Sequence, residues 1–148
     1  MGLGVRGGNY TKYEYSGHSR QMSLDQTFQY IDKTLTDHEI DLIYPQTHEC
    51  LVWQTLYERY GSLIYKPPYL RMYRNLQDFL INGPQDRPRH WDKVPKLTVA
   101  QNVNYLLDIY ILSKCGHLIA SVSNGIAFAV SLNGNCFRSK FVFNLGTY

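Results

Sequence analysis

The N-terminal stretch GLGVRGG contains residues that could bind a phosphate. Gly2, Gly4 and Gly7 have the spacing of the glycine loop that binds the pyrophosphate of a dinucleotide. That loop works because a preceding strand delivers it to a helix N-terminus, whose amides face the phosphates. Only Met1 precedes Gly2, and the residues after the stretch are not helical in pattern, so we interpret the glycine spacing as coincidental. Arg6 is the better candidate, because a guanidinium at the carboxyl end of a predicted strand over residues 3–5 suits phosphate oxygens.

A second candidate phosphate site lies in the sequence LIASVSNG. We predict a buried strand over residues 117–122 that contains Ser121, and Ser123 and Asn124 follow before a helix over residues 126–132. Hydroxyls and unbonded amides at a helix N-terminus attract anions. A serine that only caps its helix explains the same pattern equally well.

Asp108 is a carboxylate inside the most apolar predicted helix, over residues 98–114. Leu106, Leu107 and Ile109 surround it in the sequence. A buried carboxylate needs a hydrogen-bond donor, so Asp108 either binds a ligand or donor, or lies on the one exposed edge of this helix. The pattern alone favours the exposed edge.

Short apolar runs alternate with segments of helical period, which predicts an α/β domain with a mostly parallel sheet in a Rossmann-like three-layer arrangement. The predicted strands span 3–5, 42–44, 62–65, 117–122 and 141–143, with Pro45 ending the second, and the predicted helices span 24–35, 50–60, 98–114 and 126–132. Ser23 and Gln26 form a capping box before the first helix. A long loop over residues 71–95 is either functional, as a lid or acceptor contact, or a plain surface insertion.

The composition favours one domain over residues 1–148. The net charge of +3 is not clustered, which argues against a nucleic-acid partner, and no apolar run approaches the roughly 20 residues of a membrane span. Cys50, Cys115 and Cys136 are far apart and have no metal-ligand spacing, so we expect reduced thiols and no metal. Without a secretion signal in these residues, we expect a cytoplasmic protein.

Two segments resemble motifs of fucosyltransferases that use GDP-fucose. GVRGGNY resembles the family's H-x-R-x-G/T-D motif, and LLDIYILSKCGHLIASVSNG resembles its D-I-x-x-L-S-x-x-x-x-x-[IV]-x-[ST]-x-S segment. The likeness is to the superfamily of α-1,6- and α-1,2-fucosyltransferases, nodulation enzymes and bacterial capsule-locus relatives, and it covers most of the chain except residues 71–95. It implies the C-terminal, donor-binding half of a two-domain GT-B glycosyltransferase. Such a protein transfers fucose from GDP-fucose to a glycan or other hydroxyl acceptor with inversion, and needs no cofactor or metal.

The resemblance implies roles for the residues already considered. Arg6 corresponds to the arginine that holds the β-phosphate of the sugar nucleotide, and Asp108 to the carboxylate that recognises guanine. Ser121, Ser123 and Asn124 correspond to the phosphate-facing turn. The chain has no room for the acceptor-binding domain of the family, so the resemblance implies a missing N-terminal domain or a second subunit.

Four other positions are less regular. Glu14 corresponds to a general base that would accept the proton of the acceptor hydroxyl, although a solvated loop charge explains it as easily, and His18 corresponds to a Gly-His-Pro stretch of the family. Gly4 stands where the family has a histidine that contacts the base, and Asn9 replaces the aspartate of the motif. These departures leave open a fragment, a truncated gene product, or a divergent domain that has lost activity. The alternative function is therefore a non-catalytic α/β domain that binds a nucleotide or a partner.

Overall fold

The centre of the protein is a parallel β-sheet. The computed structural model describes residues 1–5, 19–47, 50–65 and 99–147. In this part of the chain the strands are β1 (Gly2–Gly4), β2 (Tyr44–Gln46), β3 (His117–Ser121) and β4 (Ser139–Phe143), in the order β2-β1-β3-β4 and parallel throughout. The α-helices are α2 (Leu24–Asp37), α3 (Cys50–Tyr60), α6 (Val99–Lys114) and α7 (Asn124–Leu132). The predicted Rossmann-like α/β fold is confirmed.

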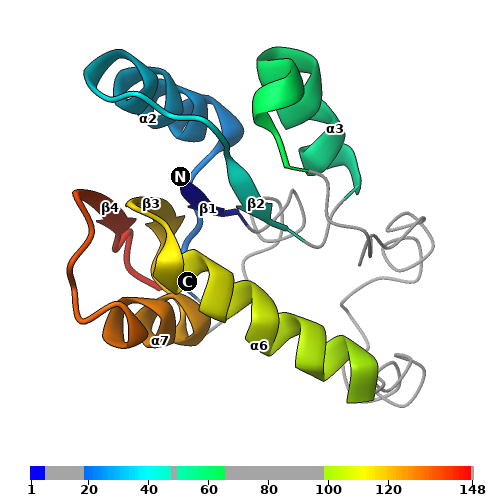
Figure 1. Cartoon of the computed structure of the whole chain (residues 1–148), viewed down its shortest axis with the longest axis vertical. Coiled ribbons are helices and arrows are strands. Elements are labelled where there is room, and N and C mark those ends of the chain that lie inside the picture. The colour runs from blue at the N-terminus through cyan, green and yellow to red at the C-terminus, as the bar shows by residue number, and fades with distance from the viewer. Residues whose placement is uncertain (6–18, 48–49, 66–98, 148) are drawn as a thin grey trace.

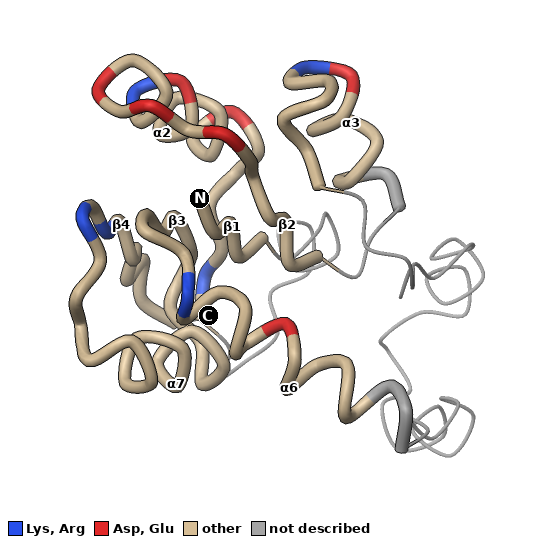
Figure 2. Tube along the Cα trace, viewed as in Figure 1, with Lys and Arg blue, Asp and Glu red and all other residues tan. Residues whose placement is uncertain are grey.

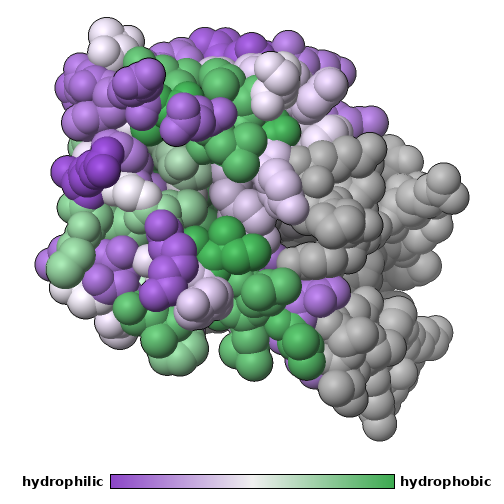
Figure 3. Space-filling model, viewed as in Figure 1, coloured by the Kyte–Doolittle hydropathy of each residue, from purple (hydrophilic) through white to green (hydrophobic). Residues whose placement is uncertain are grey.

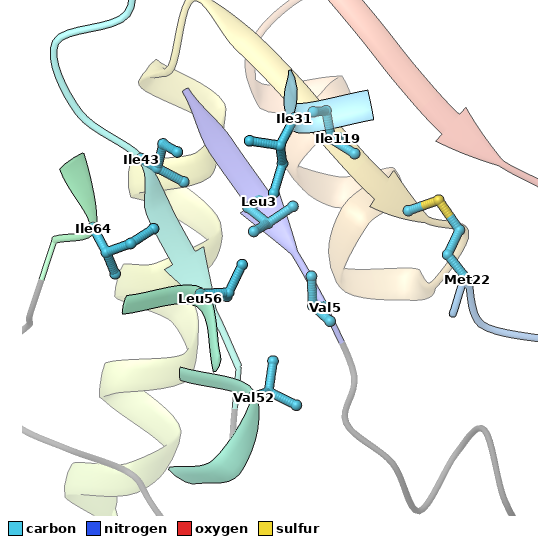
Figure 4. Packing of buried hydrophobic residues seen from close by; sticks show 9 residues of the cluster. All are labelled: Leu3, Val5, Met22, Ile31, Ile43, Val52, Leu56, Ile64 and Ile119. Carbon is cyan, nitrogen blue, oxygen red and sulfur yellow. The ribbon is translucent and has the colours of Figure 1, made fainter. Parts of the chain in front are cut away.

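The helices cover both faces of this sheet. Helices α2 and α3 lie on one face, and α6 and α7 on the other (Figure 1). Each face has its own core. The core toward α2 and α3 contains Leu3, Val5, Met22, Ile31, Ile43, Val52, Leu56, Ile64 and Ile119 (Figure 4). The core toward α6 and α7 contains Tyr44, Ile109, Leu112, Leu118, Ala120, Ile126 and Ala129.

Local sequence signals determine the start of α2. The Ser23 Oγ accepts a hydrogen bond from the Gln26 amide at 3.1 Å, and the Gln26 side chain accepts one from the Ser23 amide at 3.0 Å. This confirms the predicted capping box. Ile31 is fully buried on the face of α2 that contacts the sheet, with Thr27 and Thr34 one turn before and after it.

The glycines of β1 allow side chains of α6 and α7 to pack closely against the strand. A Cβ atom on Gly2 would lie 2.9 Å from Leu112 Cδ2, and one on Gly4 would lie 2.7 Å from Ile126 Cδ1. Because side chains alternate across a strand, both positions face α6 and α7. Gly2 and Gly4 therefore have a packing role, which agrees with the interpretation that their spacing is not that of a phosphate loop.

Two strand predictions are wrong. Residues 61–63 form a 3-10 helix, η1 (Gly61–Leu63), which begins at a left-handed Gly61 with φ of 57°. Only Ile64 then pairs with Ile43, in a single parallel bridge, so residues 62–65 are not a full strand. Pro45 also does not end the second strand but lies within β2.

Pro45 explains why this edge pairing is so short. Ile43 exchanges two backbone hydrogen bonds with the neighbouring segment, to Leu63 O at 2.7 Å and from the Tyr65 amide at 2.9 Å. The next bond of a parallel ladder would run from the amide of residue 45 to Tyr65 O, but proline has no N–H to donate. The Trp53 indole N–H donates to Tyr65 O instead, at 3.4 Å.

Helix α6 has an apolar side that faces outward, unlike an ordinary surface helix. The helix spans residues 99–114, in agreement with the prediction, and its exposed residues include Val103, Leu106, Leu107 and Tyr110. Asp108 is only 8% exposed, so the prediction that it lies on an exposed helix edge is wrong. The predicted loop over residues 71–95 lies outside the described residues.

Candidate functional site

The order of the described strands creates a switch point in the sheet, where a ligand could bind. Strands β1 and β3 are neighbours, with Gly4 opposite Ala120. The chain leaves β1 through α2 toward β2, and leaves β3 through α7 toward β4 on the other side. The two connections therefore diverge at the carboxyl ends of β1 and β3, over opposite faces of the sheet (Figure 1). In open α/β sheets, ligands bind in the crevice at such a switch point.

The described residues at this switch point form the floor of a site. Ser121, at the end of β3, is 4% exposed, and its Oγ accepts a hydrogen bond from the Met22 amide at 2.9 Å. This bond holds the segment before α2 against the end of β3. A shallow hollow here is lined by Gly4, Val5, Gln21, Met22, Thr27 and Ser121, and it has no enclosed space for even a water molecule. Ligand pockets usually measure roughly 300–1,000 Å³, so these residues alone do not form a pocket for a nucleotide.

Two helix N-termini lie at the same edge of the sheet, because the Met22 amide just before α2 donates to Ser121 Oγ at the end of β3, and α7 begins three residues after Ser121. Helix N-termini carry a partial positive charge. Asp25 stands in the first turn of α2, where its carboxylate would repel an anion. The first turn of α7 has no acidic residue, and its cap, the Ser123 Oγ, accepts from the Ile126 amide at 3.3 Å. Helix geometry leaves the amides of Asn124 and Gly125 outside the intrahelical ladder, so α7 is the better anion site.

The structure brings together only some of the predicted site residues. Ser121, Ser123 and Asn124 lie at the switch point, beside the end of β1. Ser123 is the N-cap of α7, as the capping interpretation predicts. Four other predicted residues, Arg6, Asn9, Glu14 and His18, lie outside the described residues, although Arg6 directly follows Val5 at the carboxyl end of β1.

Asp108 forms a separate buried contact. The Tyr44 hydroxyl donates a hydrogen bond to Asp108 Oδ1 at 2.7 Å, which links β2 to α6. Tyr44 is also buried, and its ring stacks on that of Tyr65 with centroids 5.6 Å apart. No sequence pattern indicates this partner, because the two residues are 64 positions apart.

Neither family models, nor curated proteins, nor solved structures match this chain. The assignment of a function therefore depends on the geometry of the switch point and on the motifs. Within the described ranges, no three His, Cys, Asp or Glu side chains are grouped in a way that could hold a metal ion. In the same part of the chain, none of the helices has the length and apolar character that crossing a membrane requires.

The amino ends of the strands carry a pair of histidines. His117, the first residue of β3, is 5% exposed, and its Nδ1 lies 2.7 Å from Ser139 Oγ. Its ring centroid is 4.4 Å from that of His38, which follows α2. Burial lowers the pKa of His117, and the nearby charges of His38, the amino terminus and Arg138 lower it further.

We expect His117 to make the stability of the fold depend on pH. The pKa of His117 is depressed in the folded state, whereas the unfolded chain titrates near its ordinary value of about 6.5. The unfolded state therefore binds more protons below that value, so the free energy of unfolding falls as the pH drops through this window. Urea denaturation at pH values from about 8 to about 5.5 measures the slope. His117→Gln is expected to flatten it, and an unchanged slope in this variant would show that His117 is not responsible.

Proposed function

We propose that this chain is the donor-binding domain of a glycosyltransferase that uses GDP-fucose, and that the diphosphate binds at the switch point between β1 and β3. The observation that carries the proposal is the position of Ser121, Ser123 and Asn124 beside the end of β1. The strands that the two motifs overlap, β1 and β3, are far apart in the sequence but are neighbours in the sheet. Ligand binding at this place is general for open α/β sheets.

The proposed chemistry needs positive charge rather than a metal. As the bond between fucose and the β-phosphate breaks, negative charge develops on the diphosphate. The Arg6 guanidinium and the first amides of α7, at Asn124 and Gly125, would stabilise that charge. Glu14 would accept the proton of the acceptor hydroxyl during inverting attack on the anomeric carbon. His18 and Asn9 would complete the nucleotide-sugar contacts.

Asp108 fits this proposal least well. A carboxylate that recognises guanine must be accessible to the base, whereas Asp108 is 8% exposed and accepts the Tyr44 hydroxyl. The resemblance implies guanine recognition by Asp108, but the proposal does not include it, and this role is tested separately from phosphate binding.

One observation favours the alternative, a non-catalytic domain that binds a nucleotide or a partner. Gly4 stands where the family's histidine would contact the base. The space beside its Cα is occupied, since a Cβ there would lie 2.7 Å from Ile126 Cδ1 and 3.0 Å from Ala120 Cβ. This strand has no room for a histidine. Binding of GDP without transfer from GDP-fucose, even with an acceptor-binding domain supplied, would favour this alternative.

We expect GDP at millimolar concentration to stabilise the chain by roughly 1–3 kcal/mol, as a ligand at ten to a hundred times its Kd does. Thermal denaturation with and without GDP measures the shift. Arg6→Ala is expected to abolish most of it, because the guanidinium would hold the β-phosphate. Arg138→Ala is the matched control, since Arg138 is an exposed arginine at the amino ends of the strands. No shift with GDP, or an equal shift in Arg6→Ala, would contradict the proposal.

A further inference from the structure

An apolar surface covers the outer side of the α6 and α7 pair. We call it the α6–α7 surface, and its residues are between 40% and 56% exposed: Val103, Leu106, Leu107, Tyr110, Phe128 and Leu132. On α6 they follow the spacing i, i+3, i+4 and i+7, which is the pattern of a helix face that packs against another element. The opposite side of α6 already packs against the sheet through Ile109 and Leu112. Helix α6 is thus apolar on two sides, and only one of them is covered by the described residues.

The contributions of the two helices adjoin each other. A Cβ on Gly125 would lie 3.4 Å from Ile109 Cδ1, so this side of α7 faces α6. Phe128 and Leu132 lie three and seven positions after Gly125 and therefore on the same side of α7. Figure 3 shows apolar surface over both helices.

The side of α6 that faces α7 is shown by its own residues. A Cβ on Gly125 would lie within 3.4 Å of Tyr105 and Ile109, Ser113 beside them is buried, and the Asn133 side-chain amide donates to Ser113 O at 2.7 Å. Leu106 and Tyr110 lie seven and three positions before Ser113, on the same side of α6. The six apolar residues therefore form one continuous surface rather than isolated exposed side chains.

Charge is almost absent from this surface. The only charged residues of α6 and α7 are Asp108, which is buried, and Lys114, whose Nζ lies 5.0 Å from the centroid of the Tyr110 ring. Helix α2 on the opposite face carries several charges (Figure 2). Among them, Lys33 and Asp37 form a salt bridge. Two copies of the α6–α7 surface could meet without repulsion between like charges.

We propose that the α6–α7 surface joins two copies of this chain in a symmetric dimer. A two-fold axis places one patch on the same patch of its partner, and this patch is apolar and uncharged over its whole centre. Six side chains of these sizes, each about half exposed, offer roughly 400–500 Å² per copy. The dimer would then bury about 800–1,000 Å², at the lower end of specific interfaces. The dimer is therefore weak and depends on concentration, and this inference does not depend on the proposed donor site.

Sedimentation velocity of the full chain between about 1 µM and about 300 µM tests this inference over the range of a weak interface. We expect the sedimentation coefficient to rise with concentration from monomer to dimer. Leu106→Lys on α6 and Phe128→Lys on α7 are each expected to weaken dimerisation at least about ten-fold, because each would bury a pair of ammonium groups in the apolar interface. Both positions are half-exposed in the monomer, so thermal denaturation should show an intact fold.

Leu42→Lys is the matched control, because Leu42 is 42% exposed but lies outside the α6–α7 surface. We expect this variant to dimerise like the unmodified chain. A chain that stays monomeric over the whole range would overturn the proposal, as would dimerisation that neither Leu106→Lys nor Phe128→Lys weakens.

Discussion

Gly4→Ala is expected to lower the free energy of unfolding by roughly 1–3 kcal/mol, the usual cost of adding a methyl group to a filled core. The new Cβ would lie 2.7 Å from Ile126 Cδ1 and 3.0 Å from Ala120 Cβ. Ile126 is 4% exposed and packed within the core, so its terminal methyl cannot turn into solvent. The Ala120 methyl could move only with β3 itself. Urea denaturation of the two proteins at one pH measures the difference.

Gly116→Ala is the matched control for this prediction. It adds the same methyl group to another glycine. Apart from the two residues next to Gly116 in the sequence, the nearest atom to the new Cβ would be Arg138 Cδ at 3.8 Å, an ordinary van der Waals distance. We expect this variant to be unchanged or more stable by up to about 1 kcal/mol, because alanine restricts the unfolded chain. If Gly4→Ala were no less stable than Gly116→Ala, the packing role of Gly4 would be wrong.

These two variants also test why glycines stand at alternate positions of β1. The sequence context predicts that this spacing is not that of a dinucleotide loop. It does not explain the spacing, because Gly2 and Gly4 pack against side chains of helices that lie more than a hundred residues away along the chain. A period of two is visible in a sequence, whereas the face of the strand that receives a distant helix is not.

The elements that could be predicted are those with signals in their own sequence. The capping box of Ser23 and Gln26, the cap at Ser123 and the buried run over residues 117–121 all depend on neighbours within a few residues. Residues 62–65 look equally like a strand. Their pairing fails because of Pro45 and Trp53, which lie elsewhere in the sequence and control whether the ladder can continue.

In the candidate site, too, the features that depend on nearby residues could be predicted and the contacts between distant residues could not. The cap at Ser123 and the turn after β3 follow from residue types, but the bond from the Met22 amide to Ser121 Oγ joins residues 99 positions apart and uses a backbone donor. No residue type marks such a donor. Asp108 was misplaced for a related reason: α6 is apolar on two sides, so its periodicity could not show which side is buried.

Tyr44→Phe is expected to lower the free energy of unfolding by about 1.5–3 kcal/mol, the range for a buried hydrogen bond to a charged group. The substitution removes the hydroxyl that donates to Asp108 Oδ1 at 2.7 Å and keeps the ring that stacks on Tyr65. Tyr57→Phe is the control, since Tyr57 is 47% exposed and its hydroxyl should contribute less than about 0.5 kcal/mol. Equal effects of the two variants would show that the bond to Asp108 does not stabilise the fold.

Combined with Asp108→Asn in a double-mutant cycle, the same substitution separates the two roles of Asp108. If Asp108 mainly links α6 to β2, the two substitutions are expected to couple by about 1–3 kcal/mol in stability. The stabilisation by GDP relative to that by pyrophosphate would then be unchanged in Asp108→Asn. If Asp108 recognises guanine, Asp108→Asn would lower the stabilisation by GDP and leave that by pyrophosphate intact. Because the Tyr44 hydroxyl already occupies Asp108 Oδ1 in a buried position, we expect the first result, with the donor phosphates held by Arg6 and the α7 N-terminus rather than through α6.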